Sequence, residues 1–203
     1  MKEIKKLERV WWHLSRNIEK KRKRGEHMIE NNPNTPEGWL YIGDDKVRYA
    51  LGEPGSYNLL VIGLNPSTAI PDKPDPTIKR IRKIAERENM EGWIMINLYP
   101  VRTPKPDELP LTIDEAIAKK NIEVIKWIEQ QYRIHSVYAT WGSNIEKRGY
   151  LVDECQKIVD SIHTESWFTG GTTTYGHPKH PLYVPYEEKM EWFSVQDYLW
   201  NFE

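Results

Sequence analysis

Cysteine and long apolar segments are scarce in this chain. A single Cys among 203 residues excludes an intramolecular disulfide, a four-thiolate iron–sulfur cluster and a cysteine-rich zinc site. The longest apolar run, Leu59 to Leu64, is too short to span a bilayer. The first residues hold no apolar segment typical of a secretory signal. We therefore expect a cytoplasmic protein with no membrane partner.

A large excess of charge of either sign is also missing. The chain has 29 Lys and Arg against 30 Asp and Glu, a net charge of −1, which argues against bulk electrostatic binding of nucleic acid. Residues 1–24 are the exception, with ten basic and three acidic side chains. Their apolar residues recur at helical spacing and predict a basic amphipathic helix within residues 1–30. A helix with a solvated basic end is favoured over an arm that contacts phosphates.

Proline is abundant and clustered. Eleven of the 14 prolines fall in residues 66–76, 100–110 and 178–185, which indicates three stiff loops on a regular scaffold. Residues 31–203 are predicted to form a single α/β domain with its core at 57–185.

Strand and helix patterns alternate along this domain. A β-hairpin is expected over residues 39–51, followed by buried strands at 58–63, 93–98, 136–140 and 165–168. Helices are expected to begin at Asp75, Thr112 and Ser143, each a capping residue, and a last helix is expected over 187–201. Short connections between strands and helices predict a three-layer α/β/α fold around a central, mostly parallel four-stranded sheet.

The proline-rich loops are expected to meet at one edge of that sheet. In parallel sheets ligands bind beyond the carboxyl ends of the strands. The chemistry should therefore lie in residues 63–76, 97–106, 141–144 and 170–183. The loop at 63–68 carries Gly, Asn and hydroxyl groups that could hold an anion or position a water, although a plain structural turn is the alternative.

Three further residues could carry chemistry. Asn97 ends the second buried strand, where its amide could read a nucleobase edge or bond its own turn. His177 and His180 lie in the Gly- and Thr-rich stretch 170–181, where either could donate a hydrogen bond to a developing anion. No carboxylate or Cys accompanies the two His in that loop, so no metal site and no cofactor are predicted.

Taken in order, these loops resemble the motifs of the uracil-DNA glycosylase superfamily over about residues 57–185. Gly63-Leu64-Asn65-Pro66 is similar to the first motif, Gly-x-Asp/Asn-Pro. Residues 92–97 with 101–103 resemble the strand whose terminal Asn reads the base, and residues 140–149 resemble a Trp-Gly segment. His-Pro at 177–178 and at 180–181 resembles the last motif. Gly-Leu-Asn-Pro-Ser-Thr-Ala and His-Pro-Leu-Tyr also resemble a bacterial and phage family of unassigned function.

The superfamily resemblance implies hydrolysis of the N-glycosidic bond of a damaged, mismatched or modified DNA base that leaves its stack. Asn65 would position the water, and His180 or His177 would stabilise the leaving base. The resemblance also implies two sets of binding residues. Gly63, Leu64, Pro66, Asn97 and Tyr99 would bind the base, and Ser67, Thr68, Gly142, Ser143 and Lys179 would contact phosphates.

Two departures from the superfamily pattern keep other functions open. Position 65 is Asn rather than Asp and cannot act as a carboxylate, and no Phe is placed to stack on a base. The alternatives are a protein that binds or hydrolyses a free nucleoside or nucleotide in the same pocket, or a non-catalytic module that binds nucleic acid.

Overall fold

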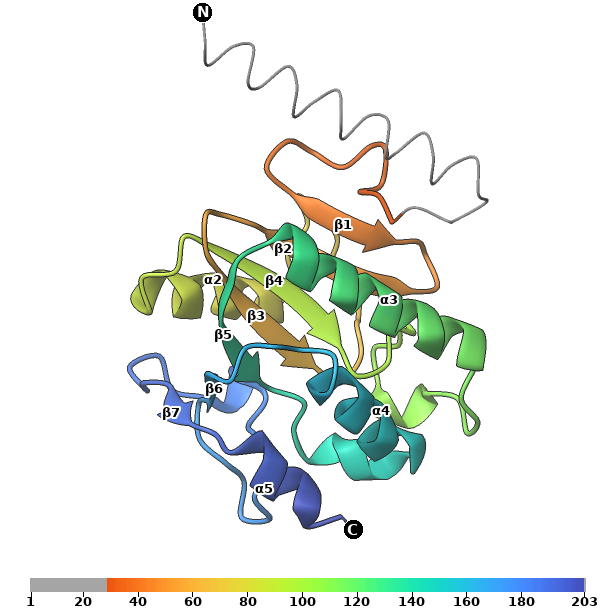
Figure 1. The fold of residues 1–203 in the computed structure, drawn as a ribbon, viewed down its shortest axis with the longest axis vertical. Helices are drawn as coiled ribbons and strands as arrows, with labels where there is room; N and C mark the ends of the chain where they lie inside the picture. Colours follow the sequence, from red (N-terminus) through yellow and green to blue (C-terminus); the bar gives the residue numbers. More distant parts are fainter. Residues whose placement is uncertain (1–28, 203) are drawn as a thin grey trace, which may run out of the picture. The chain divides into compact units, whose positions relative to one another are not determined.

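The computed structural model describes residues 29–202, so the predicted basic helix lies almost wholly outside the described residues. A seven-stranded mixed sheet forms the centre of the domain, in the order β1-β2-β4-β3-β5-β6-β7 (Figure 1). Its parallel core comprises β3 (Asn58–Gly63), β4 (Gly92–Asn97), β5 (Ile134–Ala139) and β6 (Trp167–Thr169). The predicted α/β class and parallel core are confirmed.

The expected four-stranded sheet is too small, because antiparallel strands extend both edges. The predicted hairpin, β1 (Leu40–Gly43) and β2 (Arg48–Glu53), pairs with β4 through Leu51 and Met95 instead of standing apart. Five of the six residues of β2 are buried. A strand covered in this way needs neighbours along both of its edges and on both faces.

The single helix predicted over residues 187–201 is wrong. Glu191 and Trp192 form β7, which pairs antiparallel with β6, and α5 covers only Val195–Trp200. The Trp192 ring packs edge-on against Phe168 at 5.7 Å between centroids, and the Phe193 N–H bonds to the Trp167 carbonyl at 2.9 Å. Cross-strand pairing therefore prevails over helix propensity in this segment.

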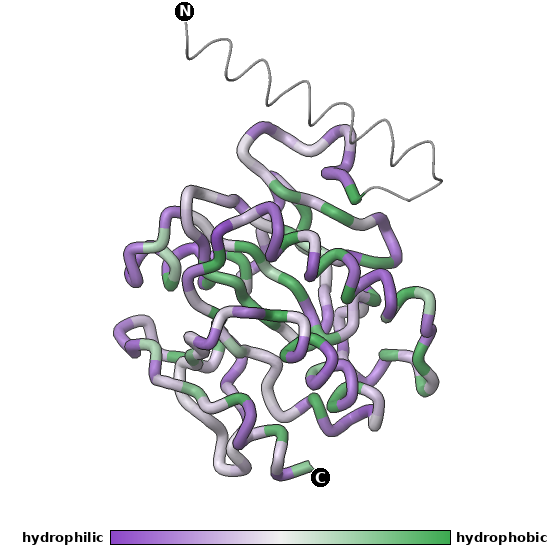
Figure 2. The backbone as a smooth tube through the Cα atoms, in the orientation of Figure 1, coloured by the Kyte–Doolittle hydropathy of each residue, from purple (hydrophilic) through white to green (hydrophobic). Residues whose placement is uncertain are grey.

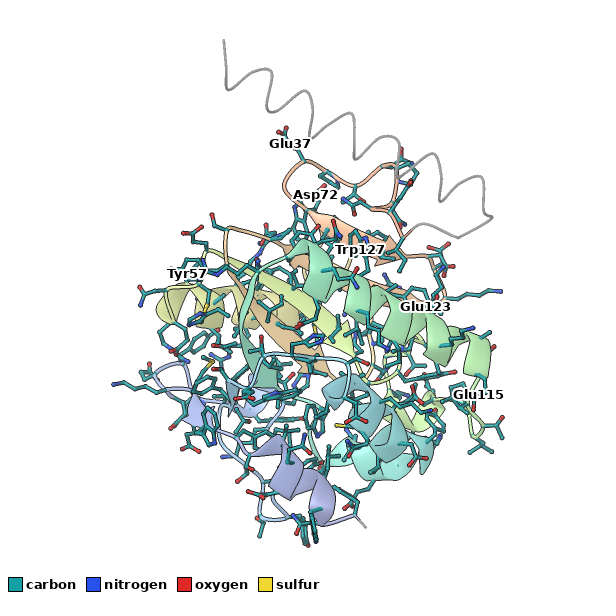
Figure 3. All side chains as sticks on the ribbon, in the orientation of Figure 1. Glu37, Tyr57, Asp72, Glu115, Glu123 and Trp127 are labelled. Carbon is teal, nitrogen blue, oxygen red and sulfur yellow. The ribbon has the colours of Figure 1, made fainter. Side chains whose placement is uncertain are left out.

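Helices cover both faces of the sheet. α2 (Pro76–Arg87) packs its apolar side on Leu59, Val61 and Met95, while α3 (Glu115–Gln131) and α4 (Tyr150–Val159) cover the other face (Figure 1). Apolar chain is concentrated in the central strands in Figure 2. The polar side of α3 carries Glu115 and Glu123 outward, as Figure 3 shows.

One predicted helix start is confirmed and two are corrected. The Asp75 carboxylate accepts from the Ile78 N–H at 2.9 Å and caps α2, with Pro76 in the first turn. α3 is capped by Asp114 rather than Thr112, because the Asp114 carboxylate reaches two backbone N–H groups. Ser143 begins only a short 3-10 helix, Ser143–Lys147, without a side-chain cap.

Within the described residues no helix is long and apolar enough to cross a membrane.

Candidate functional site

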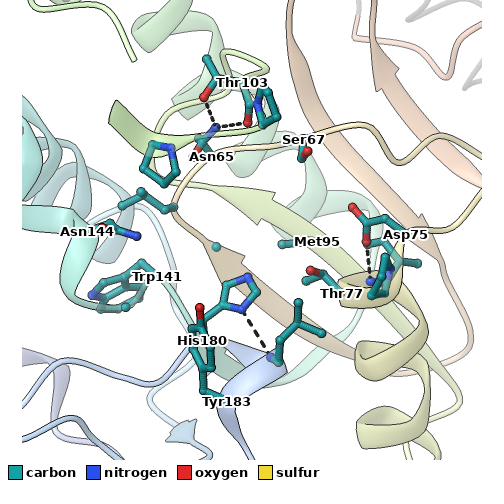
Figure 4. Close-up of a pocket in the computed structure, with 18 of the residues that line it drawn as sticks. Asn65, Ser67, Asp75, Thr77, Met95, Thr103, Trp141, Asn144, His180 and Tyr183 are labelled. Carbon is teal, nitrogen blue, oxygen red and sulfur yellow. Dashed lines mark hydrogen bonds between the residues drawn. The ribbon is translucent and has the colours of Figure 1, made fainter. Parts of the chain in front are cut away.

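A cavity of about 600 Å³ lies at the carboxyl ends of β3 and β5 (Figure 4). Each of the four loops predicted to build the site contributes to its wall: 63–76, 97–106, 141–144 and 170–183. The first turn of α2, the start of β2 and Met95 of β4 complete the lining. This volume falls in the usual range of small-molecule sites.

The cavity brings together most of the residues singled out from the sequence. Nine of them line it: Gly63, Leu64, Asn65, Ser67, Thr68, Gly142, Ser143, Lys179 and His180. Four do not line it: Pro66, Asn97, Tyr99 and His177.

The Asn65 side-chain amide is held by hydrogen bonds from its Nδ2 group, whereas its Oδ1 accepts none from the described residues. Its Nδ2 donates to the carbonyls of Pro66 and Thr103, both at 3.1 Å, and to Thr103 Oγ1 at 3.1 Å. These bonds tie the loop after β3 to the segment after β4. Oδ1 makes no hydrogen bond to any described residue, and Asn65 lies on the wall of the cavity (Figure 4). Oδ1 can therefore accept a hydrogen bond from a water or a ligand.

The structure distinguishes the two histidines that the sequence left equivalent. His180 projects toward the middle of the cavity (Figure 4), and its Nδ1 accepts from the Leu182 N–H at 3.3 Å. The neutral ring therefore carries its proton on Nε2. Burial lowers the pKa of His180 below its ordinary value, although the nearby Asp75 carboxylate acts in the opposite direction.

His177 instead belongs to an aromatic cluster outside the cavity. It is 2% exposed, its Nδ1 lies 3.0 Å from the Tyr198 hydroxyl, and its ring packs on Tyr198 and Phe202. Its Nε2 is 3.3 Å from Glu146 Oε1 without forming a hydrogen bond. These contacts fit a structural residue better than one that meets a ligand.

Asn97 and Tyr99 are also buried away from the cavity. Asn97 is paired with Gly63 across the neighbouring strands β3 and β4, and a Cβ at position 63 would come within 2.9 Å of Asn97 Oδ1, so a larger residue there would force the Asn97 side chain to move. Both polar atoms of the Asn97 amide lack a partner among the described residues. The Tyr99 hydroxyl accepts from the Asp114 N–H at 3.0 Å, which fixes the start of α3.

Two charged residues of the cavity wall were not predicted from the sequence. Arg48 was not singled out, and Asp75 was not expected to line the cavity. The signal for Arg48 was an Arg inside the otherwise uncharged run Val47 to Leu51, where a charged side chain in a buried strand is unusual. Asp75 was identified only as a helix cap. One of its oxygens caps α2, and the other makes no hydrogen bond to a described residue.

Two aromatic residues complete the wall. Trp141, buried behind Gly142, donates its Nε1–H to the Tyr198 hydroxyl at 3.1 Å. Tyr183 is 79% exposed at the cavity and contacts His180 at 5.9 Å between ring centroids. The Tyr183 ring therefore offers an exposed aromatic face at the cavity, on which a planar ligand could stack.

The described residues hold no group of three or more His, Cys, Asp or Glu able to bind a metal ion. The fold defines an α/β protein with a cavity at the carboxyl ends of its parallel strands. A family model matches residues 48–182, and the chain belongs to this family, described as a protein of unknown function (DUF1643). Comparison with curated proteins and with solved structures finds no match.

Proposed function

We propose that this protein is a nucleobase-excising N-glycosidase that acts on DNA or a nucleotide-like ligand. The observation that carries the proposal is the placement of Asn65 and His180 on one cavity, where Asn65 Oδ1 and His180 Nε2 form no hydrogen bond to any of residues 29–202. The resemblance to the uracil-DNA glycosylase superfamily supplies the reaction class. Water attacks the anomeric carbon, the carbon–nitrogen bond breaks, and the electron pair leaves with the base.

His180 would stabilise the departing base. The base leaves as an anion. A neutral imidazole can stabilise that anion by donating a hydrogen bond from its Nε2–H. Burial favours the neutral ring by lowering the pKa of His180. The Leu182 N–H holds the ring in the tautomer that this role needs.

Asn65 would orient the attacking water, and Asp75 would accept its proton. The Asn65 amide cannot take up a proton, so it can only orient the water through Oδ1. Asp75 is the one carboxylate among the described lining residues, and its second oxygen is available to accept the proton. In this way Asp75 supplies the carboxylate that position 65 lacks.

Base release from labelled oligonucleotides and from free nucleotides tests the proposal. The panel contains uracil, hypoxanthine, xanthine, mismatches and modified pyrimidines, in single and double strands. We expect release by the native protein, a loss of about a hundredfold or more in His180→Ala, and unchanged release in His163→Ala. His163 is an exposed histidine that pairs with Glu129 outside the cavity. Absence of release from every substrate would refute the proposal.

A non-catalytic nucleotide-binding protein is the second candidate. The positive charge of Arg48 and Lys179 on the cavity wall favours it, because a bound phosphate would use that charge whether or not a bond is broken. Binding of the panel without any release of base would support this alternative.

A further inference from the structure

The guanidinium of Arg48 forms no ion pair with any carboxylate of residues 29–202, although the Asp75 carboxylate is near enough to raise its pKa against the larger effect of desolvation. Arg48 is 2% exposed and lines the cavity from the start of β2. It donates to the Ala69 carbonyl at 3.1 Å and to Met95 Sδ at 3.8 Å, whereas its Nε has no partner. No Asp or Glu oxygen in the described residues lies within 4.0 Å of it. Three of the five guanidinium N–H groups therefore have no acceptor in the described part of the chain.

A second arginine adds to the positive charge. Arg102 also donates to the Ala69 carbonyl, and it bonds to the carbonyl of Ser67 at 2.7 Å and to the Tyr41 hydroxyl at 2.8 Å. None of these acceptors is a carboxylate. Two like charges therefore share one carbonyl oxygen, and all of their hydrogen-bond acceptors among the described residues are neutral groups.

A buried charge in this setting is costly. Desolvation is the main cause that lowers the pKa of Arg48 to about 10, with the neighbouring Arg102 second, so Arg48 is still charged at neutral pH. Proteins keep buried charges where a partner or a ligand compensates them. Asp75 compensates this charge only in part, because it forms no ion pair with Arg48 within the described residues, and the cavity that Arg48 lines can admit an anionic ligand.

The remaining lining charges give the cavity a positive balance. The lining contains two positively charged side chains, Arg48 and Lys179, and one carboxylate, Asp75. One oxygen of that carboxylate caps α2. The Lys179 side chain lies over Gly171, with Nζ 3.4 Å from the position that a Cβ would take. It forms no ion pair with any described residue. A cavity with this balance favours an anionic ligand.

We propose that Arg48 is the primary binding group for a phosphate of the ligand, with Lys179 as a second cation. The burial of Arg48 and its place on the cavity wall support an anion site, while the identification of the ligand as a nucleotide rests on the proposed function. A guanidinium suits this role because its planar donors match two phosphate oxygens at once. The phosphate could belong to a free nucleotide or to the backbone of a strand.

Calorimetric titration with inorganic phosphate tests the site. We compare the native protein with Arg48→Met, Arg48→Lys and the charge-matched control Arg133→Met, an exposed arginine whose side chain has no partner among the described residues. We expect Arg48→Met to bind phosphate about tenfold to a hundredfold more weakly and Arg133→Met to bind as the native protein does. Equal affinity in Arg48→Met, or no phosphate binding by the native protein, would overturn the proposal.

A measurement on the native protein covers the case in which Arg48→Met does not fold. The Nε–H resonance of Arg48, identified by its loss in Arg48→Lys, should shift on phosphate addition, and the Nε–H of Arg133 should not. An Arg48 resonance that is insensitive to saturating phosphate would refute direct binding.

Further titrations identify the source of the phosphate. Deoxynucleoside monophosphates that bind more tightly than both phosphate and the matching nucleosides indicate a free nucleotide. Tighter, salt-dependent binding of an oligonucleotide indicates a strand. Base release that persists without phosphate binding would refute this inference alone, whereas Arg48-dependent phosphate binding without base release would refute only the proposed reaction.

Discussion

Replacing Arg48 by Met should stabilise the empty protein. The lowering of the Arg48 pKa to about 10, caused mainly by desolvation, corresponds to a cost of about 3 kcal/mol for holding the charge in the folded state. Loss of the bond to Ala69 offsets about 1 kcal/mol, and Arg102 continues to donate to that carbonyl. Met retains most of the apolar stem. The free energy of unfolding should therefore rise by about 2 kcal/mol.

The pH range of this effect follows from the direction of the shift. A cation whose folded pKa is lowered destabilises the folded state fully below that pKa, and the cost disappears as the pH rises from about 10 toward the ordinary pKa of arginine. Measurements at neutral pH therefore contain the whole effect.

Urea denaturation with and without phosphate provides the assay. In phosphate-free buffer Arg48→Met should have the higher midpoint at an unchanged slope. Phosphate at a hundred times its dissociation constant should stabilise the native protein by about 2.7 kcal/mol and close the gap, but should not stabilise Arg48→Met. An Arg48→Met protein that is less stable than the native protein by more than about 1 kcal/mol in both buffers would show that the guanidinium is structural, and would refute this reasoning.

Three further predictions concern the same cavity. Asp75→Asn should abolish base release but change the free energy of unfolding in urea by no more than about 0.5 kcal/mol, since Asn caps a helix as well as Asp. Asp75→Ala, which removes the cap, should lower the free energy of unfolding by about 1 kcal/mol. Full activity in Asp75→Asn would exclude a proton-accepting role. Because burial lowers the pKa of His180, base release should stay constant as the pH falls through 6.5 and decline only below it. Asp75→Asn removes the carboxylate that raises this pKa, so the pKa of His180 measured by NMR should fall further. A decline in base release centred above pH 6.5 would contradict this prediction. Asn65→Asp should destabilise the protein by about 1–3 kcal/mol, because a carboxylate would face the carbonyls that now accept from Nδ2; an unchanged urea midpoint would contradict it.

Local patterns in the sequence determined the parallel core and the edge where the site lies. The apolar runs at 58–63 and 93–98 are long enough for strands buried on both faces, and the Asp75-Pro76 pair is a strong local helix start. Alternation of strands and helices brings the loops after the strands to the same edge. The loop residues Asn65, Gly142 and His180 could thus be placed near one another without coordinates.

The edges of the sheet and the short elements depended on contacts distant in sequence. β2 joins the sheet through Leu51 and Met95, and β7 forms because Trp192 meets Phe168. Thr112 and Ser143 are equally good caps by pattern, yet Asp114 and Gly142 occupy the cap positions. No local signal contains these distant partners, so propensity alone could not predict them.

The sequence by itself determined an α/β protein whose loops 63–68, 141–144 and 170–183 carry the polar groups of a site. Only the tertiary structure decided which of those groups meet. It separated His180 from His177, paired Asn97 with Gly63 away from the cavity, and brought Arg48 to the cavity from a strand that precedes the parallel core. The physical reason is that burial and the pairing of charges depend on side chains that converge from separate elements, while periodicity and capping depend on near neighbours in the chain.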